Sequence, residues 1–161
     1  MADITLKPVR NIETLALGFN YEGSVNLAED IATGGVSDLK VAGAQLAGTI
    51  SKAAIVVDEL VPETSSSGST YTSVIVSLGD DDDSGDDNLI DDIEVEATNA
   101  GAASTGTAFV NTGASIALPL LTDKINLLVT STGEADEALM TAGKLRIFLE
   151  YHPTAGEPFN G

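Results

Sequence analysis

The chain has 161 residues and a mass of 16.4 kDa, which fits a single domain. Its 25 acidic and 7 basic residues give a formal net charge of −18, which argues against binding to nucleic acid or to an anionic membrane, because both attract Lys and Arg. Apolar residues make up 43% of the chain, too many for a disordered acidic protein, so we expect a folded core with the charge on its outside.

The chain contains no cysteine, which excludes disulfide bonds, thiolate metal sites and cysteine nucleophiles. Its first residues lack a basic segment followed by an apolar one, so we expect no signal peptide, and no apolar run is as long as a membrane span. We therefore expect the protein to be made and first kept in the cytoplasm of the producing cell.

Alternation of apolar and polar residues is the main pattern along the chain. In chain order it predicts strands over residues 4–9, 14–21, 39–50, 53–61, 70–78, 92–97, 107–110, 116–121, 125–131 and 144–151. Turn residues separate these segments, and only residues 26–33 and 133–141 suit a helical turn or two. The pattern predicts an all-β fold, an antiparallel β-sandwich of about eight to ten short strands with little helix.

Residues 80–92 carry a run of aspartates without a basic residue. One alignment with a calcium-binding loop places Asp80 and Asp82 at the first ligand positions, Asp86 at the carbonyl position and Asp91 in place of the closing glutamate. These four are candidate ligands for Ca²⁺ or another divalent cation. A solvated acidic loop is the alternative interpretation, because an Asp-rich run meets carboxylate patterns by chance.

No arrangement typical of an enzyme is found in the sequence. His152 is the single histidine, and neither a Gly-x-Ser-x-Gly motif nor a phosphate-binding glycine loop with its lysine occurs. Glu94 and Glu96 project from the same face of a predicted strand, but we expect that face to be the solvent side of a sheet. The sequence therefore indicates no catalytic residues and no enzyme.

A series of strands and turns extends over the second half of the chain. It consists of residues 54–60, residues 70–78 with the aspartate run that follows, residues 109–121 with a Leu-Pro-Leu ending, and residues 125–133 with 142–151. This series resembles the cement or decoration proteins on the heads of tailed bacteriophages.

The resemblance implies a jelly-roll β-sandwich that binds the outside of an assembled capsid as a homo-oligomer, a dimer or trimer, and strengthens the shell without enzymatic activity. Its implied partners are the major capsid protein and further copies of the chain, with no cofactor, and its implied location is the exterior of the virion after assembly in the host cytoplasm. Lys7, Arg10, Lys144 and Arg146 are candidate contacts with acidic surfaces of the shell or of sibling copies. Ordinary solubilising charge is the alternative interpretation, since an exposed ion pair contributes under about 1 kcal/mol.

We expect a single domain over residues 1–161, with the sandwich core at 46–152, a C-terminal tail at 153–161, and either an N-terminal arm or additional strands at 1–45. A second class of function fits the same pattern, a calcium-dependent β-sandwich module that binds a ligand or carbohydrate through the acidic loop. The absence of Trp and the 4% aromatic content count against carbohydrate, because sugar sites usually present aromatic platforms.

Overall fold

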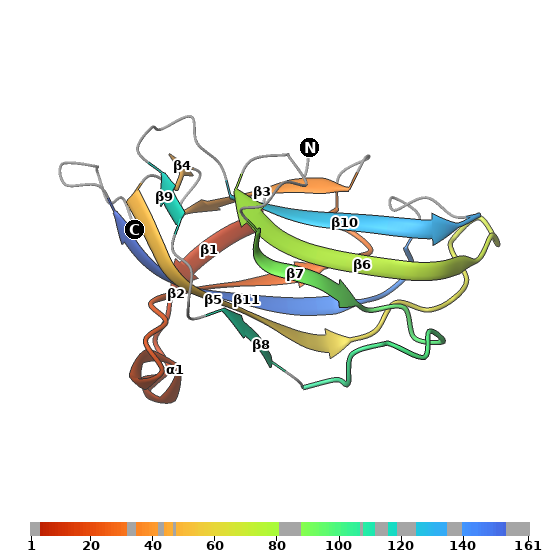
Figure 1. Ribbon diagram of the computed structural model, residues 1–161, viewed down its shortest axis with the longest axis horizontal. Helices are drawn as coiled ribbons and strands as arrows, with labels where there is room; N and C mark the ends of the chain where they lie inside the picture. Colours follow the sequence, from red (N-terminus) through yellow and green to blue (C-terminus); the bar gives the residue numbers. More distant parts are fainter. Residues whose placement is uncertain are drawn as a thin grey trace.

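The computed structural model describes residues 4–31, 35–41, 44–46, 48–80, 88–106, 108–111, 116–118, 125–134 and 140–153. Eleven strands and one short helix, α1 (Ile12–Ala16), occupy this part of the chain (Figure 1). The strands are β1 (Ile4–Pro8), β2 (Tyr21–Asn26), β3 (Val36–Val41), β4 (Ala44–Gln45), β5 (Gly48–Glu59), β6 (Tyr71–Asp80), β7 (Asn88–Glu94), β8 (Ala108–Asn111), β9 (Ile116–Leu118), β10 (Ile125–Gly133) and β11 (Lys144–Pro153). The expected all-β fold with little helix is confirmed.

The strands belong to one sheet in the order β7-β6-β10-β3-β1-β2-β11-β5-β8, with β4 added to β3 and β9 to β5. We refer to β7, β6, β10 and β3 as the first wall and to β2, β11, β5 and β8 as the second wall. Figure 1 shows β6 and β10 lying above β5 and β11, so the sheet folds over on itself. The two layers expected of a sandwich are therefore walls of one continuous sheet, whereas a jelly roll would place them in two separate sheets.

The two ends of the sheet meet just beyond β7 and β5. The Val61 amide donates to the Val95 carbonyl at 2.8 Å, and the Ala97 amide donates to the Val61 carbonyl at 2.8 Å. β7 also contacts β8, the last strand of the other end. These main-chain bonds nearly close the sheet into a flattened barrel, which leaves few exposed strand edges.

β1 joins the two walls because it changes partner along its length. Its first residues pair in parallel with β3, with Ile4 opposite Leu39, and its last residues pair antiparallel with β2, with Lys7 opposite Glu22. Among the named strands of the described chain, this parallel pair is the exception to the expected antiparallel pairing. Within residues 1–45, the described part supplies α1 and strands β1 to β4, with β1, β2 and β3 in the middle of the sheet.

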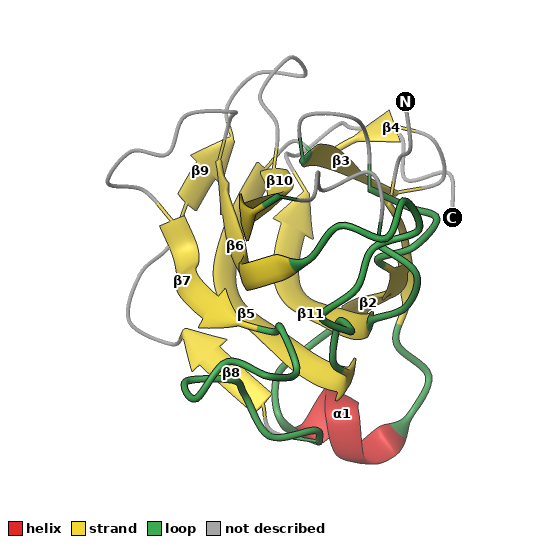
Figure 2. Ribbon diagram, turned by 90° about the vertical axis from the view of Figure 1, so that its right-hand side faces the viewer, coloured by secondary structure: helices red, strands yellow, loops and turns green. Residues whose placement is uncertain are grey.

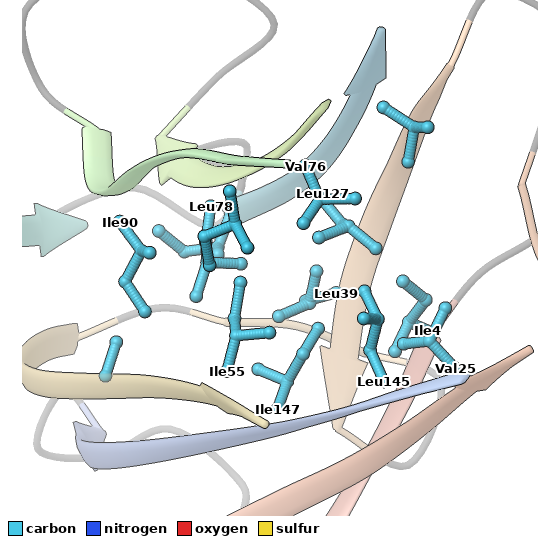
Figure 3. Packing of buried hydrophobic residues seen from close by; sticks show 14 of the residues in the cluster. Ile4, Val25, Leu39, Ile55, Val76, Leu78, Ile90, Leu127, Leu145 and Ile147 are labelled. Atoms are coloured by element: carbon cyan, nitrogen blue, oxygen red, sulfur yellow. The ribbon is translucent and has the colours of Figure 1, made fainter. Parts of the chain in front are cut away.

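One apolar core fills the space between the walls. Figure 3 shows Val76, Leu78 and Leu127 of the first wall facing Ile55 and Ile147 of the second wall, and all five side chains are fully buried. Along β5 and β11 every second residue belongs to this core, because successive side chains of a strand point to opposite faces; the residues between them, such as Ala54, Val56 and Phe148, lie on the other face. The same cluster includes residues of β1, β2, β3, β5, β6, β7, β10 and β11, so it is the main core of the described chain.

A helix replaces the strand predicted over residues 14–21. The Asn11 side-chain oxygen accepts hydrogen bonds from the Glu13 amide at 2.9 Å and from the Thr14 amide at 3.2 Å, which caps the first turn of α1. Strand β2 begins only at Tyr21. The prediction was wrong because the apolar residues of this segment were assigned to a sheet face, whereas none of the helical residues is buried.

One further segment differs from the prediction, and another agrees with it. Residues 39–50, predicted as one strand, contain the end of β3, then β4, and the start of β5. Residues 26–31 form one turn of the kind expected there, in which the Asp30 amide donates to the carbonyl of Asn26, four residues earlier, at 2.8 Å. The rest of the range predicted as 26–33 lies outside the described residues.

A β-bulge interrupts the alternation of β7. Val76 of β6 pairs with Ile93, but Leu78 pairs with Ile90, so two residues of β7 lie opposite the single residue Ser77. The second of them, Asp92, has φ +35°, a left-handed conformation that Asp tolerates better than most residues, and its amide donates to the Ser77 hydroxyl at 3.2 Å. The bulge lets both Ile90 and Ile93 point into the core while the two aspartates stay exposed.

The alternation along β10 gives a direct test of the core. Leu127→Ala removes a fully buried side chain and is expected to lower the free energy of unfolding by about 2–5 kcal/mol. Leu128→Ala, the same change at the neighbouring half-buried position, is expected to cost about 1 kcal/mol. Urea denaturation measures both, and equal costs would contradict the assignment of the two faces.

Candidate functional site

A cleft of about 440 Å³ opens at the surface where β1 separates from β2. We call it the fork cleft; its lining includes Thr5 and Lys7 of β1, Glu22 and Ser24 of β2, and Arg146 and Phe148 of β11. It exists because β1 lies beside β3 over Ile4 to Leu6 and pairs with β2 only at Lys7 and Pro8. The sequence contains no signal for this cleft, since it depends on which strands β1 pairs with.

Arg146 forms the charged side of the fork cleft. Its guanidinium donates to both carboxylate oxygens of Asp58, at 2.8 and 3.0 Å, and lies 5.7 Å from the centre of the Phe148 ring. The hydrogen bond to Asp58 raises the pKa of Arg146, with further contributions from the charges of Asp58 and Glu22. The side chain is therefore held in place and stays positively charged.

The four candidate basic contacts fall in three places. Lys7 and Arg146, which are far apart in the sequence, both line the fork cleft. Arg10 is exposed in the segment that leads from β1 to α1. Lys144 is exposed and lies 3.7 Å from Glu59 in a surface ion pair, so nothing in its surroundings distinguishes it from ordinary solubilising charge.

An exposed apolar surface lies on and next to α1. Ile12 is 82% exposed, Leu15 45% and Leu17 63%; we call these three residues the α1 patch. Figure 2 shows α1 outside the strands at the lower end of the molecule. Large exposed apolar side chains that occur together mark interaction surfaces more often than isolated ones do.

Contacts beyond the helix hold the α1 patch against the second wall. Phe19 is buried on the outer face of this wall, 5.9 Å from the ring of Phe148, in a small apolar cluster separate from the main core. The Lys52 ammonium donates to the Leu17 carbonyl and lies 4.8 Å from the Phe19 ring. Gly18 makes the turn between α1 and Phe19 with φ +97°, a conformation that other residues rarely adopt. The patch is thus presented on a fixed base.

His152 and Glu150 lie side by side near the end of β11. The Ser51 hydroxyl donates to Glu150 Oε1, and His152 Nε2 lies 3.7 Å from the same oxygen. The hydrogen bond from Ser51 lowers the pKa of Glu150, with smaller contributions from His152 and Lys52. Ser51 is bonded to the carboxylate and not to His152, so these residues do not form the chain of bonds in which a histidine activates a serine.

The expectation that Glu94 and Glu96 both face solvent was wrong. Glu94 is half-buried, and its carboxylate accepts hydrogen bonds from the Ser73 hydroxyl and from the amides of Val74 and Glu96. Glu96 is fully buried and accepts bonds from the amide and hydroxyl of Thr98. Both carboxylates satisfy backbone groups where β7 leaves the sheet, which is a structural role.

The acidic run contributes little to the described structure. Asp82 and Asp86 lie outside the described residues. Asp80 is the last residue of β6, and its side chain also lies outside the described part. Asp91 is exposed in the bulge of β7. Within the described part of the chain, no three His, Cys, Asp or Glu side chains gather as metal ligands. The cation site stays a prediction.

A scan against protein-family models, a search of curated proteins and a search of solved structures each find no match to the chain. In the residues that the structure describes, no helix has the length and apolar character needed to cross a membrane.

Glu150 gives the protein a measurable dependence on pH. Because its pKa is held below the ordinary value of 4.5 in the folded state, its contribution to stability is fully present above pH 4.5 and is lost as the pH falls through the folded-state pKa. The side chain is 31% exposed, so we expect Glu150→Gln to cost about 1 kcal/mol or less at pH 7 and less than that at about pH 3.

Urea denaturation of the wild type and of Glu150→Gln at both pH values measures this difference. Glu63→Gln, at an exposed position, is the control for a general change in charge. A cost of Glu150→Gln that is the same at both pH values would show that the charge of Glu150 is not its cause.

Proposed function

We propose that the protein is a structural accessory protein that binds the outer surface of a tailed-phage head and stabilises its shell. The observation that carries the proposal is the α1 patch, three large apolar side chains exposed on a fixed projection from the second wall. Exposed large apolar side chains are unfavourable in water, and in a protein with a net charge of −18 a group of them indicates a surface that a partner covers.

The charges near the α1 patch also fit a binding surface. Arg10 precedes the helix, Lys52 bonds to its C-terminal end, and Lys7 and Arg146 line the adjoining fork cleft. These four are more than half of the seven basic residues in the chain. A face that is apolar and less acidic than the rest suits contact with a second protein, while the remaining carboxylates keep particles apart in solution.

The resemblance to cement and decoration proteins adds support from the sequence. Residues 54–60, 70–78, 125–133 and 142–151 fall mainly in β5, β6, β10 and β11, which form the centres of the two walls. The proposal places the protein on the capsid exterior, with the major capsid protein as its partner and without enzymatic activity. The alternative calcium-dependent module rests on residues that lie mostly outside the described chain.

Binding to purified heads that lack the protein tests the proposal. The double substitution Ile12→Ser and Leu17→Ser is expected to weaken co-sedimentation with heads at least about tenfold, because burial of each side chain contributes about 1.5–3 kcal/mol. Ile12 and Leu17 are both exposed, so the variant should keep the stability of the wild type in urea. Bound wild-type protein should also raise the temperature at which heads rupture.

Glu13→Ser is the matched control, since it introduces the same residue at an exposed position of the same helix and leaves the α1 patch intact. It is expected to bind like the wild type. Unimpaired binding by the double variant, or no binding of the wild type to heads, would refute the proposal.

A further inference from the structure

Residues 10–19 leave the sheet and return to it as a closed loop that carries the α1 patch. The Val9 amide donates to the Asn20 carbonyl at 2.9 Å, which brings the two ends of the loop together. Asn20 is in turn bonded to β11. Its amide donates to the Leu149 carbonyl at 3.0 Å, and its side chain bonds to the amide and the carbonyl of Tyr151, both at 2.8 Å. The base of the loop is therefore fixed, and α1 lies beyond this base.

α1 is too short to be stable by itself. It spans five residues, none of them buried, whereas an isolated helix needs roughly 12–15 residues to be even marginally stable in water. Asn11 caps its first turn, but the helix has no basic residue in its last turn, where carbonyl groups lack partners and the helix dipole favours a positive charge. The order of its C-terminal end must therefore come from another part of the chain.

Lys52 of β5 supplies the missing partner. Its ammonium donates to the carbonyl of Leu17, the C-cap residue of α1, and lies 4.8 Å from the centre of the Phe19 ring. Within the part of the chain that the structure describes, this is the one hydrogen bond that joins residues 10–19 to any other segment. Leu17 belongs to the α1 patch, so the bond acts directly on the surface that a partner would meet.

The turn after α1 passes close to Lys52 and Glu150. A Cβ atom on Gly18 would lie 2.9 Å from Glu150 Oε2 and 3.4 Å from Lys52 Nζ, so the chain approaches this pair as closely as glycine allows. The Glu150 carboxylate accepts a hydrogen bond from the Ser51 hydroxyl, and its charge attracts that of Lys52. The ammonium of Lys52 is therefore kept in place beneath the end of α1.

We propose that Lys52 is the positioning residue of the α1 patch: by bonding to the Leu17 carbonyl from β5, it holds α1 in the orientation in which the shell protein meets it. The inference rests on the proposed function. A patch that is ordered before binding loses less conformational entropy when it binds, which is the benefit of preorganisation. Lys52 thus contributes to affinity without having to contact the partner.

Two substitutions of Lys52 separate its hydrogen bond from its packing. Lys52→Met keeps an apolar stem beside Phe19 but removes the donor and the charge, whereas Lys52→Arg retains both. NMR order parameters of the free proteins provide the first measurement. The Gly18 amide, which donates to the Leu15 carbonyl at 3.0 Å, should have an order parameter of about 0.85 in the wild type and in Lys52→Arg, and below about 0.6 in Lys52→Met. An equally rigid α1 in all three proteins would overturn the inference.

Co-sedimentation with purified heads provides the second measurement. Lys52→Met is expected to bind about three- to tenfold more weakly than the wild type, because the entropy of ordering α1 is then lost on binding, and Lys52→Arg is expected to bind like the wild type. Urea denaturation verifies that both variants are folded.

Two outcomes of the binding experiment would contradict the positioning role. Unchanged binding by Lys52→Met is one, and weaker binding with an equally rigid α1 is the other, since Lys52 would then act by its charge alone. If the wild type does not bind heads, the proposed function fails, whereas the order parameters still decide whether Lys52 holds α1.

Discussion

Burial of alternate side chains between two walls of one sheet is the interaction on which the rest of the structure depends. Val76, Leu78 and Leu127 of the first wall and Ile55 and Ile147 of the second are fully buried against each other. With these residues facing inward, the residues next to them along each strand point to the opposite face of the sheet. The register of each strand is thereby fixed, because a slip by one residue would exchange the two faces.

The same constraint explains why β1 crosses between the walls. A sheet that folds over on itself needs a strand at the corner that belongs to both layers, and β1 fills this role by pairing first with β3 and then with β2. Leu6 of β1 packs into the core and lies close to Gly23 of β2, where a side chain would collide with it. The end of the β1–β2 ladder at Lys7, and with it the cleft, is thus a consequence of how the two walls are joined.

Local alternation was enough to predict the strands that form the centres of the walls. Residues 125–131 and 144–151 were predicted as strands, and β10 and β11 extend them by two residues each. The prediction failed where a side chain overrides the pattern, as Asn11 does by capping α1. Exposure of Ile12 and Leu17 was not predicted, because an amphipathic rule assigns apolar residues to the core. The cleft depends on the pairing of distant segments, which a single sequence does not encode locally.

The position of β11 has a consequence for how the chain folds. This last strand lies between β2 and β5, so residues 144–149 pair with residues 21–26 on one side and with the strand that begins at residue 48 on the other. The second wall therefore stays incomplete until the C-terminal part of the chain has left the ribosome. Such long-range pairing gives a high contact order and slow folding, during which β2 and β5 are exposed without their partner. The abundance of acidic residues, which repel other unfinished copies, protects the chain from aggregation during this interval.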